Sequence, residues 1–276
     1  MEISKKLFFI GSGNMASAII SGLLESNLVK SENVVCNDVV KEKVVNLQKK
    51  YGISIAEDKG EAIIGADIIF FSVKPQNMPK VFDEIKHFIR NKAIVISIAA
   101  GITTKFIEDS IQKRIAVIRA MPNTPALVRL GATALCKGRF VSDDQLQKAK
   151  NLFDSIGKAE IIDERNFDII TALSGSGPAY IFYFCELMQK AAEKFGLDKD
   201  VTKIFAVQTV YGAGKMLDIT KESAERLKEK VKSPNGTTEA ALKYFESQKL
   251  QDIIYEAMNQ AMEKSKALSN KLCKGD

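Results

Sequence analysis

Short apolar runs alternate with longer helical patterns through the first part of the chain. The runs Ile68-Ile69-Phe70-Phe71 and Ile94-Val95-Ile96 are continuously apolar, as strands buried on both faces of a sheet are. Helical patterns such as Asn14–Ser26 and Gln145–Ile156 lie between such runs. The alternation predicts an α/β fold with a doubly wound, mostly parallel sheet. The expected strands are Leu7–Ile10, Asn33–Asn37, Ile53–Ile55, Asp67–Val73, Ile94–Ala99, Ile115–Arg119, Ala132–Cys136 and Ala159–Ile162.

The pattern changes after Ile162, where β-branched runs give way to helical periodicity. Two glycine-bearing segments, Ser174–Pro178 and Ser233–Thr238, interrupt this region. We therefore predict two domains, residues 1–162 with the sheet and residues 163–276 entirely helical. The helices expected in the second domain are Phe182–Phe195, Lys199–Leu217, Thr237–Gln248 and Leu250–Ala267.

Composition narrows the classes of function. With 46% hydrophobic and 27% charged residues, the chain is typical of a globular protein. Its net charge of +6 is spread along the sequence, which argues against nucleic-acid binding and is compatible with anionic small molecules. The four cysteines are widely separated, so the sequence suggests neither a disulfide framework nor a metal site. Because the first apolar run is short and no long one follows, we expect a cytoplasmic protein without a membrane segment.

A glycine loop follows the first expected strand and opens a helix. It reads Gly11-Ser12-Gly13-Asn14-Met15-Ala16, and Asp38 follows the second expected strand. In dinucleotide-binding proteins the first glycine permits a tight turn, and the second lets the backbone approach a pyrophosphate. The helix start then offers N–H groups to the phosphates. This arrangement predicts that residues 1–162 form a Rossmann-type dinucleotide-binding domain.

The choice between NADH and NADPH stays open at this point. A carboxylate at Asp38 accepts a hydrogen bond from a ribose 2′-hydroxyl and repels a 2′-phosphate, which favours NADH. Lys41 and Lys43 follow closely, however, and are able to neutralise a phosphate. They serve equally well as solvated residues of the next helix.

Two further loops follow apolar strands and are expected at the ligand-binding edge of the sheet. They are Ser72-Val73-Lys74-Pro75 and Ala99-Ala100-Gly101, and Lys74 is either a cofactor contact or a surface lysine. The residues expected to contact the cofactor are Ile10, Gly11, Ser12, Gly13, Asn14, Met15, Asn37, Asp38, Ser72, Val73, Lys74, Pro75, Ala99 and Ala100.

Several segments spread over nearly the whole chain resemble those of pyrroline-5-carboxylate reductases. The glycine loop alone is shared by many dehydrogenases, whereas the run from Ile118 to Pro125 and the two glycine-bearing segments are far more restrictive. The segments are Gly11–Ala16, Val73-Lys74-Pro75, Ser97–Gly101, Ile118–Pro125, Leu173–Tyr180 and Ser233–Thr238.

The resemblance implies reduction of 1-pyrroline-5-carboxylate, a cyclic imino acid, to L-proline by NADPH or NADH. It further implies an active site between the cofactor domain and the helical domains of a dimer that can assemble further. The apolar faces of the helical region, which are extensive for a small domain, agree with a homodimer.

The Pro234-Asn235-Gly236 turn leads into a helix, so we expect its N–H groups to form a carboxylate site with Ser233, Gly236 and Thr237. By resemblance, the Thr238 hydroxyl reaches the ring nitrogen and acts in catalysis, although threonine is also a common cap near a helix start. Glu164 matches an acidic position near the substrate, or is simply a helix-start glutamate.

The sequence departs from the family pattern at two positions. Asn235 replaces the more usual glycine, and its ability to adopt positive φ should preserve the turn. Lys59 stands where an asparagine often holds the cofactor, which puts the adenosine contacts in question.

Three other functions compete with imino-acid reduction. A β-hydroxyacid dehydrogenase has a similar glycine loop but uses a helical lysine, and here the corresponding helix has none before Lys190. Another imine reductase and a non-catalytic NAD(P)-binding sensor are the remaining alternatives. The intact Ser233–Thr238 loop argues against the sensor.

Overall fold

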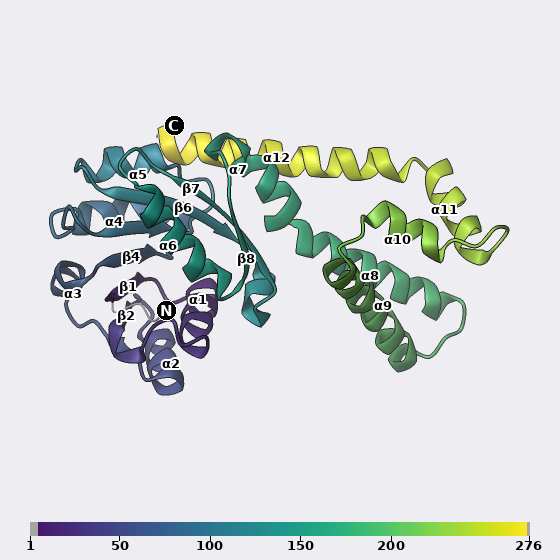
Figure 1. Cartoon of the computed structure of the whole chain (residues 1–276), viewed down its shortest axis with the longest axis horizontal. Helices are drawn as coiled ribbons and strands as arrows, with labels where there is room; N and C mark the ends of the chain where they lie inside the picture. The colour runs from purple at the N-terminus through teal and green to yellow at the C-terminus, as the bar shows by residue number, and fades with distance from the viewer. Residues whose placement is uncertain (1–4, 275–276) are drawn as a thin grey trace. The chain divides into compact units, whose positions relative to one another are not determined.

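The structure is a computed structural model that describes residues 5–274 (Figure 1). Its contacts divide the chain into two compact units. The first, which we call the sheet unit, contains the chain up to Gly175 and the segment from Ala261 onward. The second, the helical unit, is Ser176–Gln260.

An eight-stranded sheet forms the centre of the sheet unit, in the order β3-β2-β1-β4-β5-β6-β7-β8. Neighbouring strands are parallel except for β6 and β7, which are antiparallel. This confirms the predicted fold class, and each predicted strand has a counterpart. The strands are β1 (Leu7–Ile10), β2 (Val34–Asn37), β3 (Ser54–Ile55), β4 (Ile68–Phe71), β5 (Ile94–Ser97), β6 (Ala116–Pro122), β7 (Gly131–Lys137) and β8 (Gly157–Ile161).

Helices alternate with these strands and then continue alone. In the sheet unit they are α1 (Asn14–Glu25), α2 (Lys41–Tyr51), α3 (Lys59–Gly65), α4 (Met78–Ile85), α5 (Thr104–Ile111), α6 (Asp143–Asp154) and α7 (Phe167–Ile170). The later helices are α8 (Gly177–Lys194), α9 (Lys199–Thr220), α10 (Ala224–Val231), α11 (Thr237–Ser247) and α12 (Leu250–Lys274).

Two hydrophobic clusters cover the two faces of the sheet, because successive side chains of a strand point to opposite faces. Leu7 and Phe9 of β1 belong to one cluster, with side chains from α1, α2 and α6. Phe8 and Ile10 belong to the other, with side chains from α3, α4 and α5. The sheet unit is therefore a three-layer structure whose strands are buried on both sides.

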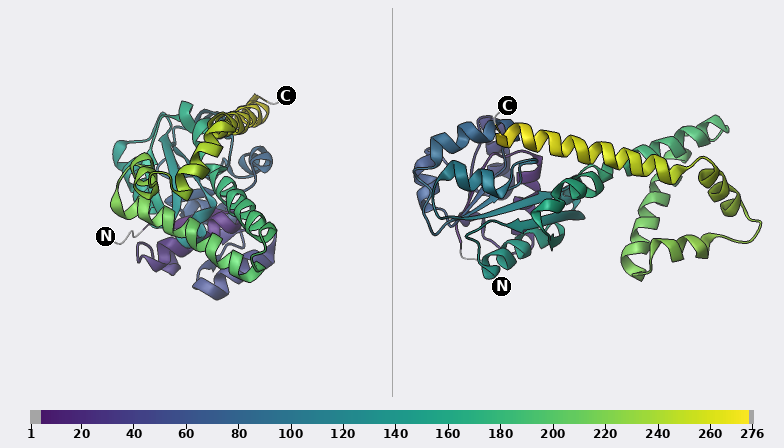
Figure 2. Two further views of the ribbon diagram at one scale, coloured as in Figure 1. Left: turned by 90° about the vertical axis from the view of Figure 1, so that its right-hand side faces the viewer. Right: turned by 90° about the horizontal axis from the view of Figure 1, so that it is seen from above.

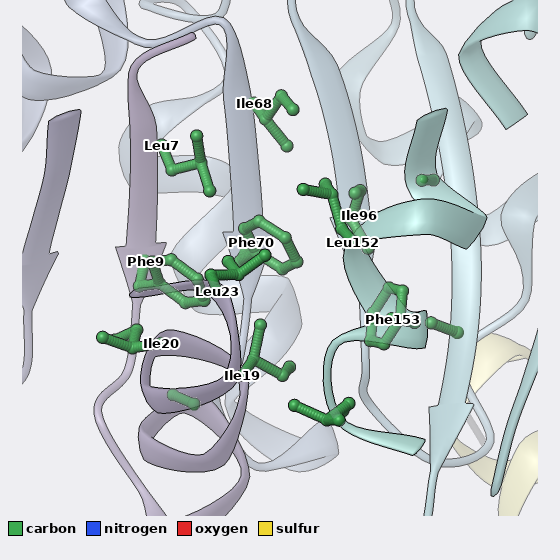
Figure 3. Packing of buried hydrophobic residues seen from close by; sticks show 14 of the residues in the cluster. Leu7, Phe9, Ile19, Ile20, Leu23, Ile68, Phe70, Ile96, Leu152 and Phe153 are labelled. Carbon is green, nitrogen blue, oxygen red and sulfur yellow. The ribbon is translucent and has the colours of Figure 1, made fainter. Parts of the chain in front are cut away.

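Aromatic stacking organises the first of these clusters (Figure 3). The rings of Phe9 and Phe70, on neighbouring strands, stack with centroids 4.3 Å apart. Phe153 of α6 meets the Phe70 ring edge-on at 6.3 Å. These contacts fix β1 beside β4, the pair of strands at which the winding of the sheet reverses direction.

The helical unit has almost no core of its own. Helices α8 and α11 bury no residue completely, α9 buries only Thr202 and Ala206, and α10 buries only Leu227. Large apolar side chains stay exposed instead, including Phe182, Tyr183, Ile204 and Phe205. A unit of this kind requires a partner surface to bury its apolar area.

Several helices after residue 176 differ from their predicted extent. Helix α9 continues beyond Leu217 to Thr220, and α10 was not predicted. Helix α8 begins at Gly177 rather than Phe182, because Pro178 suits a first helical turn. Helix α10 is short and highly charged, so its single buried residue gave no periodic signal. Helix α12 continues beyond Ala267 to Lys274.

The last turns of α12 pack against the rest of the sheet unit (Figure 2). The Ser265 hydroxyl donates a hydrogen bond to Asp168 Oδ1 at 2.7 Å, and Ser269 Oγ donates to the Gly101 carbonyl at 2.8 Å. Leu272 packs against the second hydrophobic cluster. None of the helices within residues 5–274 is long and apolar enough to cross a membrane.

Replacing Phe70 with alanine should lower the free energy of unfolding by about 3–5 kcal/mol, because it removes a ring packed against two others. Urea unfolding measures this effect. Ile64→Ala is the control, since that side chain is 50% exposed, and it should lower stability by less than about 1 kcal/mol. Equal losses in the two variants would contradict this account of the core.

Candidate functional site

The carboxyl ends of β1, β2, β4 and β5 gather the residues predicted to hold a cofactor. Ile10 pairs with Asn37 on one side and with Phe71 on the other, so Gly11, Asp38 and Ser72 follow at the same edge. The sheet is wound outward in opposite directions from β1 and β4. Ligands of open α/β sheets bind in the crevice at such a switch point.

Gly11 is required by the fold itself. Its φ of +96° is one that other residues rarely adopt, and a Cβ there would lie 2.6 Å from the Ser72 carbonyl oxygen. The Gly11 N–H also donates to the Asn37 carbonyl at 2.8 Å. The loop therefore ties the ends of β1, β2 and β4 together.

Gly13 has a different surrounding, because a Cβ added to it would meet nothing within 4 Å. It is the N-cap of α1 and provides no side-chain hydrogen bond to the helix start. The first-turn N–H groups of Asn14, Met15 and Ala16 therefore face this open space with the positive end of the helix dipole. These features fit a pyrophosphate close to the backbone.

A buried hydroxyl adds a second indication that a ligand belongs at this edge. Within residues 5–274, Ser72 Oγ finds no hydrogen-bond partner. Such a group costs about 1–3 kcal/mol when it stays unsatisfied. Lys74 follows it, exposed, at the start of the 3₁₀ turn Pro75–Asn77. A bound dinucleotide would give both side chains a polar partner.

Asp38 is held against the glycine loop. Its Oδ2 accepts hydrogen bonds from the Ser12 N–H at 2.7 Å and the Ser12 hydroxyl at 3.0 Å, and its Oδ1 accepts from the Val40 N–H at 2.8 Å. Burial alone would raise the pKa of Asp38. The hydrogen bonds from Val40 and Ser12, with the charge of Lys43, outweigh burial and hold this pKa below its ordinary value.

The Ala99-Ala100-Gly101 loop follows β5 and is fixed from a distant part of the chain. Gly101 has a φ of +75°, and a Cβ there would lie 3.4 Å from the backbone of Ser269 in α12. The hydrogen bond from Ser269 to the Gly101 carbonyl fixes the same point. Ser269 was missed as a positioning residue, because a serine within a polar helix end gives no sequence signal.

The segment Ser233–Thr238, predicted to bind a carboxylate, forms a turn at the start of α11 within the helical unit. Asn235 has a φ of 55°, as expected for a residue standing in place of glycine. The Gly236 N–H donates to the Ser233 carbonyl at 3.0 Å, and a Cβ on Gly236 would collide with the Ser233 hydroxyl. A side chain at position 236 would therefore require the Ser233 hydroxyl to move.

Helix α11 starts directly after this turn, with Gly236 as an N-cap that has no side chain to offer. Helices α5, α6 and α10 begin differently, with capping side chains on Thr103, Ser142 and Ser223. At α11, as at α1, no side chain caps the first N–H groups, and their binding of an anion stays a prediction. Glu239 Oε2 accepts a hydrogen bond from the Asn235 N–H at 2.7 Å, which holds the turn.

Glu164, a predicted substrate contact, lies in the sheet unit. Its Oε1 accepts hydrogen bonds from the Thr104 N–H at 2.8 Å and from Arg119 at 3.2 Å, and Oε2 accepts from the Thr104 hydroxyl at 2.7 Å. Arg119 is buried and stacks over the Phe167 ring, with 4.3 Å between the guanidinium carbon and the ring centroid. These partners give Glu164 a structural task, and its contact with substrate stays a prediction.

Two other polar residues have structural partners. Lys59 pairs with Glu84 at 3.0 Å, so its charge is directed towards α4. Asn123 donates to Ser174 and accepts from the Ala132 N–H, which joins β7 to the segment before α8. Within the sheet unit the structure brings the predicted cofactor residues to one edge of the sheet. Within the helical unit, Ser233, Gly236, Thr237 and Thr238 lie at the start of α11.

Comparison with known proteins identifies the family. Residues 164–268 match the family described as pyrroline-5-carboxylate reductase dimerisation, and residues 6–101 match NADP oxidoreductase coenzyme F420-dependent. Pyrroline-5-carboxylate reductase of Escherichia coli is 39% identical over 267 residues, 97% of this chain and 99% of that protein. The chain belongs to the pyrroline-5-carboxylate reductase family.

Other members of the family agree over the full length. Pyrroline-5-carboxylate reductase 2 of Bacillus subtilis is 36% identical, covering 95% of this chain and 94% of that protein. The solved pyrroline-5-carboxylate reductase of Coxiella burnetii superposes with a TM-score of 0.91 at 36% identity, covering 96% of this chain and 99% of that one. The Plasmodium falciparum pyrroline carboxylate reductase with NADP bound gives a TM-score of 0.86 at 30% identity, covering 98% and 100%.

A dehydrogenase from the competing class shares only the fold. 3-Hydroxyisobutyrate dehydrogenase of Mycobacterium tuberculosis has a TM-score of 0.51 at 14% identity, covering 75% of this chain and 70% of that one. The competing β-hydroxyacid dehydrogenase function is not favoured, because pyrroline-5-carboxylate reductases match nearly the whole chain at 36–39% identity.

Gly13→Ala should leave the melting temperature nearly unchanged while weakening dinucleotide binding about tenfold or more, because the added methyl group meets only space reserved for the ligand. Thermal unfolding and fluorescence titration with NADH and NADPH measure the two effects. Gly11→Ala is the comparison and should lower stability as well, because its methyl group collides with Ser72. Unchanged affinity in Gly13→Ala would refute the assignment of this edge.

Proposed function

We propose that this protein reduces 1-pyrroline-5-carboxylate to L-proline with NADPH or NADH. The observation that carries the proposal is the match to pyrroline-5-carboxylate reductases over 94–99% of their length. Both helix starts that need anionic ligands, those of α1 and α11, lie within that match. A steady-state assay of cofactor oxidation, with and without the imine, tests it directly.

The sheet unit holds the cofactor in this proposal. The N–H groups at the start of α1 bind the pyrophosphate, and Asp38 faces the adenosine ribose. Ser72 and Lys74 offer a hydroxyl and a charge next to them. When bound, the reduced nicotinamide supplies the hydride, and the protein supplies orientation and electrostatics.

The Ser233–Thr238 turn holds the substrate carboxylate. The Thr237 and Thr238 N–H groups lie at the positive end of α11, and the Ser233 hydroxyl lies beside Gly236. Glu239 lies in the same first turn of α11, but its negative charge repels a bound anion only in part. The Asn235 N–H, and then Lys243, lower the pKa of Glu239, and Lys243 at 3.2 Å offsets its charge.

Thr238 is proposed as the catalytic residue. Its hydroxyl orients the imine nitrogen and passes it the proton that completes reduction. Glu164 is proposed as a substrate-binding residue whose carboxylate is held in place by its hydrogen bonds from Thr104 and Arg119.

We assign residues 1–162 to dinucleotide binding and residues 163–276 to substrate binding and dimerisation, supported by the family match at residues 164–268.

The competing dehydrogenase chemistry lacks its acid–base group. Helix α8 presents no lysine in its first turns, and Lys190 forms an ion pair with Glu186 one turn before it. A non-catalytic sensor would bind the dinucleotide without oxidising it in the presence of the imine. The same assay therefore separates the sensor from the reductase.

The protein is a homo-oligomer, and we propose a dimer built from the helical unit that can assemble further. Two observations support the dimer. Residues 164–268 match the family described as pyrroline-5-carboxylate reductase dimerisation, and α8 and α9 leave apolar side chains exposed.

We also propose a cytoplasmic location. Cys36, Cys136 and Cys185 are free, and burial raises the pKa of the Cys36 and Cys136 thiols to about 12, which suits a reducing compartment.

Thr238→Ala should lower kcat about 100-fold and leave the affinity for the cofactor nearly unchanged, because only the proton-transferring hydroxyl is lost. Steady-state kinetics and cofactor titration measure the two quantities. Thr209→Ala is the matched control, since the Thr209 hydroxyl only donates to the Phe205 carbonyl within α9. Parental turnover in Thr238→Ala would show that the role is wrongly assigned.

Phe205→Glu should convert the oligomer into a species nearer the 30.4 kDa chain mass, because it puts a charge on an apolar surface that is 66% exposed in one chain. Light scattering coupled to size exclusion measures the mass. Lys203→Glu on the same helix is the control and should keep the parental mass. A monomeric parent protein would contradict the proposed assembly.

A further inference from the structure

The turn after β5 brings one residue to the surface at the ligand-binding edge of the sheet. The Ile102 N–H donates to the Ala99 carbonyl across this turn, and Gly101 has a φ of +75°. A positive φ at the third of four residues is typical of a type II turn. Ala99, Gly101 and Ile102 are buried, whereas Ala100 is exposed. The turn therefore presents Ala100 to a ligand and keeps its other residues within the protein.

This turn lies on the nicotinamide side of the cofactor site if the proposed function holds. The strand order places β2 on one side of β1, and β4 and then β5 on the other. A dinucleotide lies across the switch point, with its adenosine ribose near the acidic residue after β2 and its pyrophosphate at the start of α1. The remaining half, the nicotinamide riboside, then extends towards β5 and the turn that follows it.

The sheet unit fixes the chain on both flanks of the turn. Before it, the Ile98 N–H donates to the Phe71 carbonyl at 3.1 Å, and the Ala99 N–H donates to Ser97 Oγ at 3.3 Å. After it, the N–H and the hydroxyl of Thr104 donate to the Glu164 carboxylate. These contacts act before and after the exposed residue rather than at Gly101.

Ser269 of α12 acts at Gly101 itself. Its Oγ donates to the Gly101 carbonyl at 2.8 Å, although the two residues are 168 positions apart in the sequence. A Cβ built on Gly101 would lie 3.4 Å from the Ser269 backbone, so the helix lies directly against the turn. A hydrogen bond and a backbone contact thus act together on the residue that follows Ala100.

The end of α12 is itself anchored, which allows it to hold the turn in place. Ser265, Ser269 and Leu272 are spaced by four and three residues, so they lie along one face of the helix. Ser265 is 8% exposed and donates to Asp168 Oδ1 at 2.7 Å. Leu272 packs against the second hydrophobic cluster, to which Ile102 belongs. Ser269 therefore lies between two anchors on the same face.

We propose that Ser269 is a positioning residue for the nicotinamide half of the cofactor, acting through the Gly101 carbonyl and the exposed Ala100. The proposal rests on the proposed function only in taking the sheet unit to bind a nicotinamide dinucleotide. A turn held in one conformation loses little freedom when its ligand binds. Loss of the hydrogen bond therefore weakens binding of the nicotinamide half and leaves the adenosine half, on the other side of β1, unaffected.

Ser269→Ala tests the proposal, because it removes the hydroxyl and keeps a good helix former in α12. Calorimetric titration of the full-length protein should show about fivefold weaker binding of NADH and of NADPH. ADP and its 2′-phosphorylated form, which lack the nicotinamide riboside, should bind as tightly as to the parent protein. In the imine assay, KM for the cofactor should rise while kcat changes by less than about twofold.

Two further variants make the result specific. Ser110→Ala is the matched control, because the Ser110 hydroxyl donates to the Phe106 carbonyl within α5, and its loss should change the binding of no ligand. Gly101→Ala disturbs the turn itself, since alanine is strained at this φ, and should give the same selective loss as Ser269→Ala. Thermal unfolding of each variant checks that it is folded.

The outcomes separate this proposal from the proposed function. Parental affinity for both complete cofactors in Ser269→Ala overturns it, even if the protein reduces the imine. Equal weakening of the complete cofactors and of the ADP fragments also overturns it, because that result indicates a general loss of structure. Selective weakening supports it even if the imine is not reduced, which would contradict only the proposed function. Binding of no dinucleotide by the parent protein overturns both.

Discussion

The close approach of β1 and β4 at their carboxyl ends is the constraint on which the site depends. Stacked Phe9 and Phe70 rings hold the two strands together from below. Above them, the Gly11 backbone comes so close to the Ser72 carbonyl that no side chain fits between. This contact forces the chain into a tight turn and directs the start of α1 over the edge of the sheet. Ser12, within the same turn, then places the Asp38 carboxylate. Packing in the core and recognition at the edge are thus two results of one strand pair.

Glycine has two distinct tasks in this protein. At Gly11 the protein's own backbone leaves no room for a side chain, and at Gly101 the positive φ favours glycine. A side chain at Gly13 would meet no protein atom, and we assign the space in front of it to a ligand. Both helix starts assigned to anions begin with glycine, whereas α5, α6 and α10 cap themselves with serine or threonine. Helices α2, α4, α7 and α8 also lack a side-chain cap, so what α1 and α11 share is a glycine N-cap, which places no side chain in front of the first N–H groups.

Much of the sheet unit follows from its sequence, because strands buried on both faces are continuously apolar and their ends are marked by glycine and proline. Runs such as Ile68–Phe71 have no plausible alternative to a central strand. The positive φ of Asn235 was likewise predictable from the chemistry of asparagine. What the sequence does not reveal are contacts made over long separations. The partners of Glu164 and the hydrogen bond from Ser269 to Gly101 depend on how distant segments pack, and no local pattern encodes them.

Helix α12 bears on how the sheet unit folds during translation, because it contacts residues that are made much earlier. Leu272 of α12 packs against a cluster whose other members come from residues up to Val117. During translation, most of the strands emerge from the ribosome long before this residue does. The part of the second face that Leu272 contacts is therefore uncovered until α12 has been made. Removing the last turns of α12 would leave that part of the cluster exposed.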